Sequence, residues 1–153
     1  MLRIILVAVV VVTFLALQRV GAEVRPNSLF SDNAVLQRGV NVPVWGTASN
    51  GEQVTVSIQG QRVSTTARDG EWMVRLRALD EGGPYEMTIN DITLRNILVG
   101  EVWLAGGQSN MVWSVAASVN GAEEVAAATY PQIRLCQVPR VAATEPTDQV
   151  AAT

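Results

Sequence analysis

A serine at the end of an apolar run is the residue in this chain with the clearest capacity for chemistry. Ser109 lies in the sequence Gly-Gly-Gln-Ser-Asn-Met, residues 106–111, which we call the serine turn, and it follows an apolar run from Ile97 to Leu104. Glycines after a buried strand let a substrate carbonyl approach backbone N–H groups, which stabilise the oxyanion of acyl transfer. A serine hydroxyl also needs a base to take its proton, and the chain contains no histidine. The pattern therefore predicts one half of a nucleophilic site.

The serine turn also fits a purely structural interpretation. Met111 stands where the α/β-hydrolase elbow G-x-S-x-G requires glycine, so that motif does not apply. By residue type alone, a polar strand-to-loop turn with Asn110 as a cap is the commoner explanation. Glu123 and Glu124 have no partner at a spacing suited to acid–base catalysis. The sequence also shows no metal-ligand cluster and no phosphate-binding glycine loop.

Four tryptophans are the other candidates for contact with a ligand. Their rings stack well on sugars, but Trp45, Trp72 and Trp103 fall in strand patterns and are expected in the core. Trp113 follows the serine turn directly, and it is the tryptophan that we expect to line a pocket.

The elements that must position the serine begin with a β-rich region from Ser28 to Leu98. Apolar and polar residues alternate over residues 54–59, 72–77 and 85–89, as half-buried strands require. Turn residues separate these runs, at Asn50-Gly51, Gly60, Asp69-Gly70 and Gly82-Gly83-Pro84. Short strands with such regular punctuation predict an antiparallel β-sandwich of about seven strands.

The pattern changes to strand, helix, strand after Leu98. Residues 98–107 are apolar without alternation, as in a strand covered on both faces. Asn120 and Glu123 have the spacing of a capping box, which predicts a helix that ends near Tyr130. Residues 133–138 then read as a second apolar strand with Cys136 as an inert buried thiol. This is the opening of an α/β domain, and the polar tail does not continue it, so we interpret the sequence as part of a longer protein.

Composition and the first residues bound the class of protein. Arg3, an uncharged run from Ile4 to Leu17 and small residues before Glu23 predict a signal peptide over residues 1–22, with a membrane anchor as the alternative. Its removal leaves nine arginines against fourteen acidic residues, and there is no lysine. This acidic balance argues against nucleic acid as a partner. One cysteine cannot form a disulfide within the chain, so the fold needs a hydrophobic core. We expect Asp32 to be a turn residue and Arg38 to be a solvated surface charge.

The segment VGEVWLAGGQSNM resembles the nucleophile segment of the SGNH hydrolases, in the form carried by sialate O-acetylesterases and related carbohydrate acetylesterases. The similarity extends over roughly residues 28–140, through LFSDNAVLQRGVNVPVWGTASNGEQVTV, DGEWMVRL, GGPYEMTI and AEEVAAATYPQIRLCQVPR. It implies a β-sandwich domain beside a flavodoxin-like catalytic domain. On this basis we expect a signal peptide at 1–22, a sandwich at 23–97 and an incomplete SGNH-type domain at 98–153.

The resemblance also implies a chemistry. Ser109 would be the nucleophile and its own N–H one oxyanion donor, and Gln108, Asn110 and Trp113 are expected to contact the substrate, an O-acetylated sugar. No cofactor and no metal are implied. Relatives take a glycine, an asparagine and a D-x-x-H segment from later parts of the chain, and none of these has a counterpart here. Val112 also departs from the glutamate that relatives carry at this position.

We therefore expect an exported carbohydrate O-acetylesterase whose present chain is inactive alone. The alternative is a secreted β-sandwich module that binds carbohydrate or protein without catalysis. The sequence does not predict the oligomeric state or which acetylated sugar is cleaved.

Overall fold

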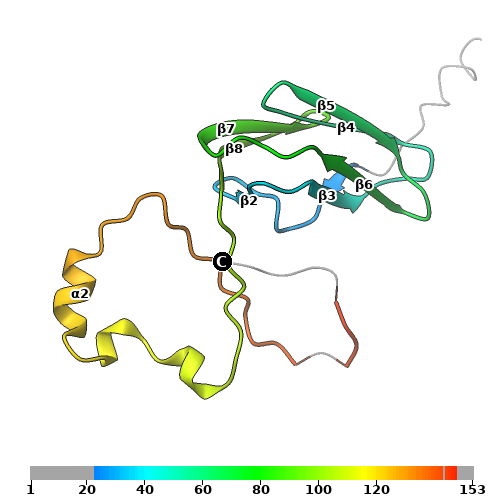
Figure 1. Ribbon diagram of the computed structural model, residues 1–153. Helices are drawn as coiled ribbons and strands as arrows, with labels where there is room; N and C mark the ends of the chain where they lie inside the picture. Colours follow the sequence, from blue (N-terminus) through cyan, green and yellow to red (C-terminus); the bar gives the residue numbers. More distant parts are fainter. Residues whose placement is uncertain (1–22, 143, 148–153) are drawn as a thin grey trace, which may run out of the picture.

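Two β-sheets form the body of the protein in the computed structural model, which describes residues 23–142 and 144–147 (Figure 1). The three-stranded sheet has the order β1-β3-β6, with β1 at Arg25–Pro26, β3 at Val42–Thr47 and β6 at Glu71–Leu76. The five-stranded sheet has the order β2-β8-β7-β4-β5, with β2 at Val35–Gln37, β4 at Gln53–Ile58, β5 at Gln61–Thr66, β7 at Gly82–Ile89 and β8 at Ile92–Gly100. The predicted signal peptide, residues 1–22, lies outside the described residues.

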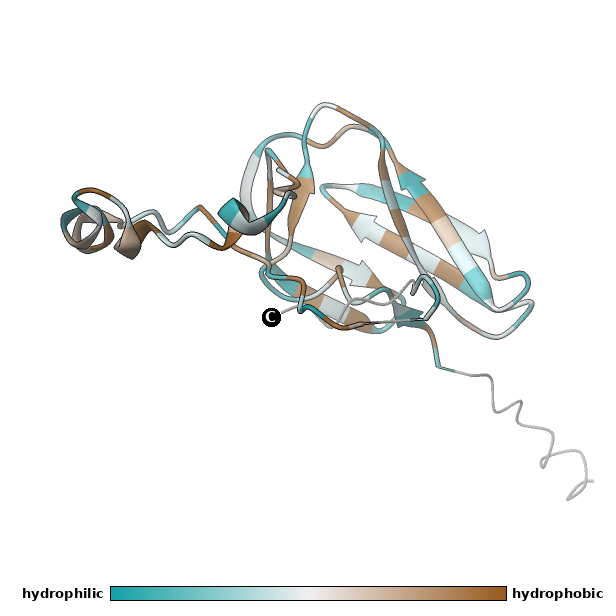
Figure 2. Cartoon of the chain, turned by 90° about the horizontal axis from the view of Figure 1, so that it is seen from below, coloured by the Kyte–Doolittle hydropathy of each residue, from teal (hydrophilic) through white to brown (hydrophobic). Residues whose placement is uncertain are grey.

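One hydrophobic core joins the two sheets. Its members come from β2, β3, β4, β6, β7 and β8 and from the turns between them, and all lie between Phe30 and Val99. Buried and exposed residues alternate along β4 and β6, as the sequence predicts. Figure 2 shows this alternation as successive changes of hydropathy along the strands. The mostly β prediction for this region is therefore confirmed.

The sheets differ from the sequence prediction in three ways. Eight strands are described instead of about seven, and β2 pairs with β8 in parallel, through the partners Val35 and Leu98, Leu36 and Val99, Gln37 and Gly100. A parallel pair needs a long connection, and no local pattern marks such a distant partner. The expected turn at Gly82-Gly83-Pro84 is instead the start of β7. The finer division into a sandwich and an SGNH-type domain remains a prediction.

The chain after Gly100 leaves the sheets as a wide loop (Figure 1). It contains the 3₁₀ turns η1 (Ser109–Val112) and η2 (Val115–Ala117) and the short helix α2 (Gly121–Ala127). We call residues 101–107 the outgoing segment and residues 133–138 the return segment. The described residues of both segments contain no strand, so the first and third elements of the expected strand–helix–strand unit are not seen as strands in these segments. An apolar run forms a strand only where a neighbouring strand satisfies its backbone groups.

The structure of this loop corrects three further expectations, two about exposure and one about helix capping. Trp103 is 85% exposed rather than in the core, and Cys136 is an exposed free thiol rather than a buried one. Among the described residues, no second layer packs on the segments that carry them. The helix begins where predicted, but Asn120 has a left-handed backbone and makes no side-chain cap; its carbonyl accepts from the N–H groups of Glu123 and Glu124.

No helix within the described residues has the length and apolar character needed to cross a membrane.

Candidate active site at the serine turn

The serine turn is organised by two backbone hydrogen bonds that wind it into η1. The Met111 N–H donates to the Gln108 carbonyl at 3.0 Å, and the Trp113 N–H donates to the Asn110 carbonyl at 3.2 Å. Gln108 itself is extended, so the chain turns sharply at the residue before the serine. The Met111 side chain folds back onto Gly107, and a Cβ at position 107 would lie 2.7 Å from it, so glycine suits this position. Ser109 is therefore the first residue of a tight turn that follows an extended segment.

Ser109 is exposed, and its polar atoms are available. Among the described residues, none forms a hydrogen bond with its hydroxyl or with its backbone N–H. The first N–H groups of a helical turn lack partners inside the turn and favour negative charge. The arrangement therefore offers a hydroxyl and an unpaired N–H at one residue, which is the pair that acyl transfer to serine requires.

The other predicted site residues lie in the same short stretch. Gln108 and Asn110 are exposed on either side of the serine. Trp113 is 69% exposed, and its indole N–H donates to the Ala117 carbonyl at 3.2 Å, which ties the ring to η2. A ring held by its N–H while its surface stays open can contact a ligand, but Trp113 lines neither the pocket at Arg38 and Glu101 nor the pocket at Asn50 and Asp69. The expectation that Trp113 lines a pocket stays a prediction.

The structure brings no base to Ser109. The chain has no histidine, and no described carboxylate forms a hydrogen bond with the serine hydroxyl. The described residues also contain no group of three or more metal-binding side chains. The described residues thus offer a serine hydroxyl and a free backbone N–H at the candidate site, with no proton acceptor bonded to the hydroxyl.

A polar cluster fixes the point at which the outgoing segment leaves the sheet. We call it the clamp, and it consists of Gln37, Arg38, Glu81 and Glu101. The Gln37 side chain accepts from the Val102 N–H at 2.8 Å and donates to the Glu101 carboxylate at 3.0 Å. The clamp therefore holds both the backbone and the side chain of the first residues after β8.

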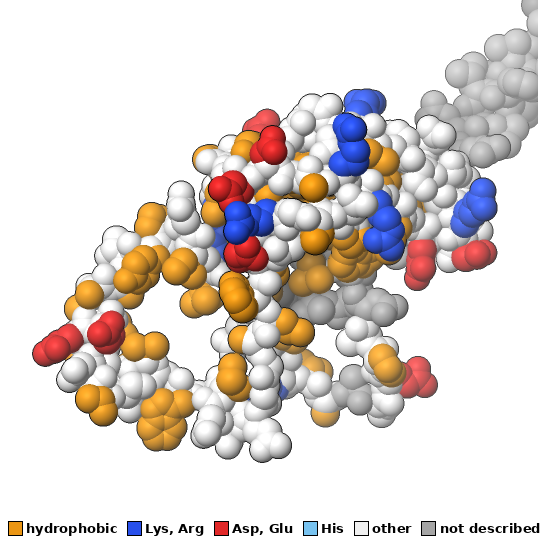
Figure 3. All heavy atoms as spheres, in the orientation of Figure 1, with side chains coloured by type: hydrophobic (Ala, Val, Ile, Leu, Met, Phe, Trp, Pro, Cys, Tyr) orange, Lys and Arg blue, Asp and Glu red, His pale blue; other side chains and the backbone are white. Residues whose placement is uncertain are grey.

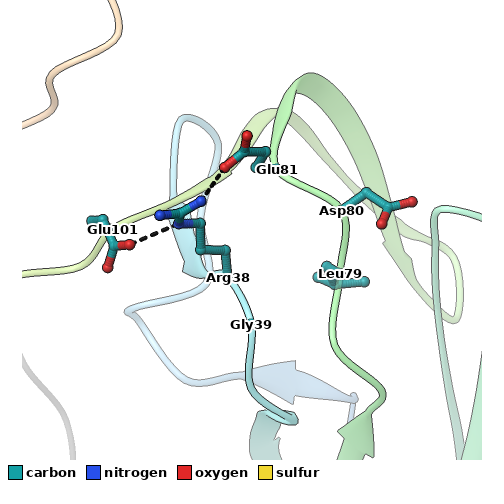
Figure 4. Close-up of a pocket in the computed structure, with 6 residues that line it drawn as sticks. All are labelled: Arg38, Gly39, Leu79, Asp80, Glu81 and Glu101. Atoms are coloured by element: carbon teal, nitrogen blue, oxygen red, sulfur yellow. Dashed lines mark hydrogen bonds and ion pairs between the residues drawn. The ribbon is translucent and has the colours of Figure 1, made fainter.

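Arg38 completes the clamp by binding two carboxylates. Its Nε donates to Glu101 at 2.7 Å, and its Nη1 forms an ion pair with Glu81 (Figure 4). Hydrogen bonds from Gln37 and then from Arg38 hold the pKa of Glu101 below its ordinary value of 4.5. The bonds to Glu101 and Glu81 raise the pKa of Arg38 in turn. Arg38 is thus a paired residue rather than the solvated charge that the sequence suggested.

A shallow pocket of about 450 Å³ lies at the clamp and not at the serine turn (Figure 4). It is lined by Arg38, Gly39, Leu79, Asp80, Glu81 and Glu101. Its one cation is already bound by two carboxylates, and the remaining charges are negative. We assign this pocket to the clamp and keep Ser109 as the candidate for the active site.

Comparison with solved structures gives the class of protein. The chain is similar to a carbohydrate acetylesterase from Xanthomonas citri, with a TM-score of 0.77 and 39% sequence identity over 84% of this chain and 31% of that one. No family model matches the sequence. The two sheets and the exposed serine that follows them thus belong to a chain that is related to a carbohydrate acetylesterase.

Curated relatives narrow the class to a family. The chain is 33% identical to human sialate O-acetylesterase over 142 residues, which is 82% of this chain and 27% of that protein. It is 34% identical to the mouse sialate O-acetylesterase over 124 residues, 70% of this chain and 23% of that protein. The chain belongs to a sialate O-acetylesterase-like family. It spans about a quarter of the length of the curated relatives that it matches.

Proposed function

We propose that this chain is part of a carbohydrate O-acetylesterase in which Ser109 is the nucleophile. The observation that carries the proposal is the exposed Ser109 at the start of η1, with its hydroxyl and N–H unpaired among the described residues. The relationship to acetylesterases supports the reaction class. The substrate would be an O-acetylated carbohydrate, sialic acids among them, and neither a cofactor nor nucleic acid takes part.

The reaction would proceed by acyl transfer in two steps. The Ser109 oxygen attacks the acetyl carbonyl while a base accepts the hydroxyl proton, and the Ser109 N–H donates to the oxyanion. The carbon–oxygen bond to the sugar then breaks, and the sugar oxygen takes that proton and leaves as an alcohol. Water attacks the acetyl-serine, which releases acetate and restores the serine hydroxyl. Gln108, Asn110 and Trp113 would contact the sugar.

The base and two further oxyanion donors would come from a longer protein. General-base assistance needs a group within hydrogen-bond reach of the serine and with a pKa near the working pH. Carboxylates in water are too acidic for this role, and arginine does not deprotonate. Loss of one oxyanion donor alone typically lowers the rate by roughly 10²–10³. The chain of 153 residues is therefore proposed to be inactive by itself.

The finer architecture belongs to the same proposal. Residues 23–97 would form a β-sandwich domain, and residues 98–153 the first part of an SGNH-type domain. Residues 1–22 would be a signal peptide that directs export. Mass spectrometry of the secreted protein should then find Glu23 at the N-terminus, and an intact Met1 in a membrane fraction would argue for an anchor instead.

One observation favours a second function. The core is built entirely from residues 30–99, so the two sheets do not depend on the loop for their packing. A secreted module that binds carbohydrate or protein without catalysis would need no more than these sheets. Binding of unacetylated glycans by residues 23–100, without acetate release by any longer form, would favour this module.

The test of the esterase is acetate release by the longer protein. Its substrates are an O-acetylated sialic acid and 4-nitrophenyl acetate, and the 153-residue chain is the matched control. We expect turnover by the longer protein and none by the control. Turnover by the control would contradict the assignment of the base to another segment, and the absence of turnover in both would contradict the esterase.

A further inference from the structure

A β-bulge in β8 exposes backbone groups that the sheet does not use. Met87 pairs with Leu94 and Tyr85 pairs with Ile97, so two residues of β8 face one residue of β7. These two residues are Arg95 and Asn96, and Asn96 has a left-handed backbone with φ of 58°. A bulge leaves its extra residue outside the ladder and turns its groups away from the partner strand. The bulge thus presents the Asn96 carbonyl to another part of the molecule.

The group that meets this carbonyl comes from the return segment. The Arg134 guanidinium donates to the Asn96 carbonyl, to the Asn96 side-chain oxygen at 3.0 Å and, at 3.4 Å, to the Ala34 carbonyl beside it. The Asn96 side-chain N–H₂ donates to Asn33 at 2.7 Å, which leaves its oxygen to face Arg134. Guanidinium presents several donors in a fixed plane and is suited to several acceptors at once.

Arg134 is less exposed than nearly all of the loop around it. Among the described residues after Gly100, Gly121 is buried, Arg134 is partly buried, and all others are exposed. The hydrophobic side chains of the loop are spread along it and lie open in the space-filling view (Figure 3). The loop therefore returns to the sheet through one polar contact rather than through apolar packing.

We propose that Arg134 is a positioning residue that ties the return segment to the bulge and so fixes the loop that carries Ser109. The clamp holds the outgoing end of this loop at Gln37 of β2, just after β8 ends, and Arg134 holds the other end at Asn96 of β8 and at Ala34, just before β2. A loop fixed at both ends has less freedom than one fixed at a single end. The role of Arg134 in catalysis rests on the proposed function, but its contact with the bulge does not.

The single cysteine provides the test of the contact. Cys136 is exposed, and it lies two residues from Arg134, at most about 7 Å along the chain. A nitroxide attached to Cys136 of the 153-residue chain should broaden the amide signals of residues 33–35 and 95–97 in a heteronuclear NMR spectrum. Arg134→Met should abolish most of this broadening, and Arg134→Lys should restore part of it, since lysine keeps the charge without the planar donors.

Arg140→Met is the matched control, because Arg140 is exposed and lies in the same loop. It should leave the broadening unchanged, while unchanged amide chemical shifts in β4 and β6, recorded with the nitroxide reduced, report that all variants are folded. Broadening that is absent in the parent chain, or that persists in Arg134→Met, would overturn the contact.

The second arm measures catalysis in the longer protein. Arg134→Met should lower kcat for acetate release about tenfold or more, because small displacements of a nucleophile are costly, with KM within about twofold. Arg134→Lys should recover part of kcat, and Arg140→Met should keep all of it. An unchanged kcat in an active Arg134→Met enzyme would overturn the positioning role. An inactive parent enzyme would overturn the proposed function instead, and the NMR result would still decide on the contact.

Discussion

Two methionines test the placement of the β-strands by the same substitution. Met87 in β7 is fully buried, whereas Met73 in β6 is 47% exposed. Replacement of a buried methionine by alanine removes buried methylenes and leaves a cavity, which costs about 2–5 kcal/mol. A half-exposed methionine on a strand surface loses less contact, and we expect a cost below about 1 kcal/mol.

The expected loss is large against the stability of the whole domain. A body of roughly 80 residues has a free energy of unfolding of about 4–12 kcal/mol. For a domain of this size each kcal/mol shifts Tm by about 4–8 °C, so Met87→Ala should lower Tm by roughly 8–40 °C. Met73→Ala should lower it by less than about 8 °C.

The assay is a urea titration of the 153-residue chain and the two variants, followed by far-ultraviolet circular dichroism, with thermal melts alongside. The slope of the transition should stay unchanged, which shows that stability and not the unfolded state has changed. A shift of one residue in register moves every side chain of a strand to the other face. Equal losses in the two variants, or a larger loss for Met73→Ala, would therefore refute the placement of these strands.

Two further predictions concern the sheets and the clamp. A Cβ on Gly46 would lie 2.1 Å from a backbone carbonyl oxygen of β1, so Gly46→Ala should lower the free energy of unfolding by about 1–3 kcal/mol. Gly100 has open space at its Cβ, so Gly100→Ala should change that free energy by less than about 0.5 kcal/mol. The same urea titration measures both, and equal effects would contradict the packing of β1 on β3. Because the pKa of Glu101 is lowered in the folded protein, its contribution to stability is complete above pH 4.5 and is lost as the pH falls through the lower folded pKa. An NMR titration of the Glu101 carboxyl should therefore find its midpoint below pH 4.5. Gln37→Leu and Arg38→Met should each raise that midpoint, and an unshifted midpoint in both variants would argue against the clamp.

Sequence reasoning succeeded where a strand has one buried and one exposed face. Val54, Val56 and Ile58 alternate with polar residues, and all three are buried in the core. Such alternation is a direct consequence of the two-residue repeat of a strand. The serine turn can be proposed from the sequence for a similar reason, since its glycines and its place after an apolar run are local features, and its role stays a prediction.

The failures concern partners that are distant in sequence. Nothing near Arg38 indicates that Glu81 and Glu101 will bind it, and nothing near Arg134 indicates a bulge at Asn96. The apolar runs of the outgoing and return segments predict that these residues are buried, but the runs themselves do not indicate which part of the protein would cover them. Cys136 was misplaced for this reason, because its burial was inferred from a strand that the structure does not contain.

The central claim is that Ser109 is the nucleophile of an acetylesterase. The most direct test is kcat for acetate release by the longer protein with Ser109→Ala, compared with Ser114→Ala five residues along the same exposed loop. Residues of a catalytic triad typically contribute roughly 10⁴–10⁶ in kcat. We therefore predict a loss of at least about 10⁴ for Ser109→Ala, with an unchanged circular dichroism spectrum, and a change of less than about twofold for Ser114→Ala. A loss of only a few-fold in a folded Ser109→Ala enzyme would contradict the account.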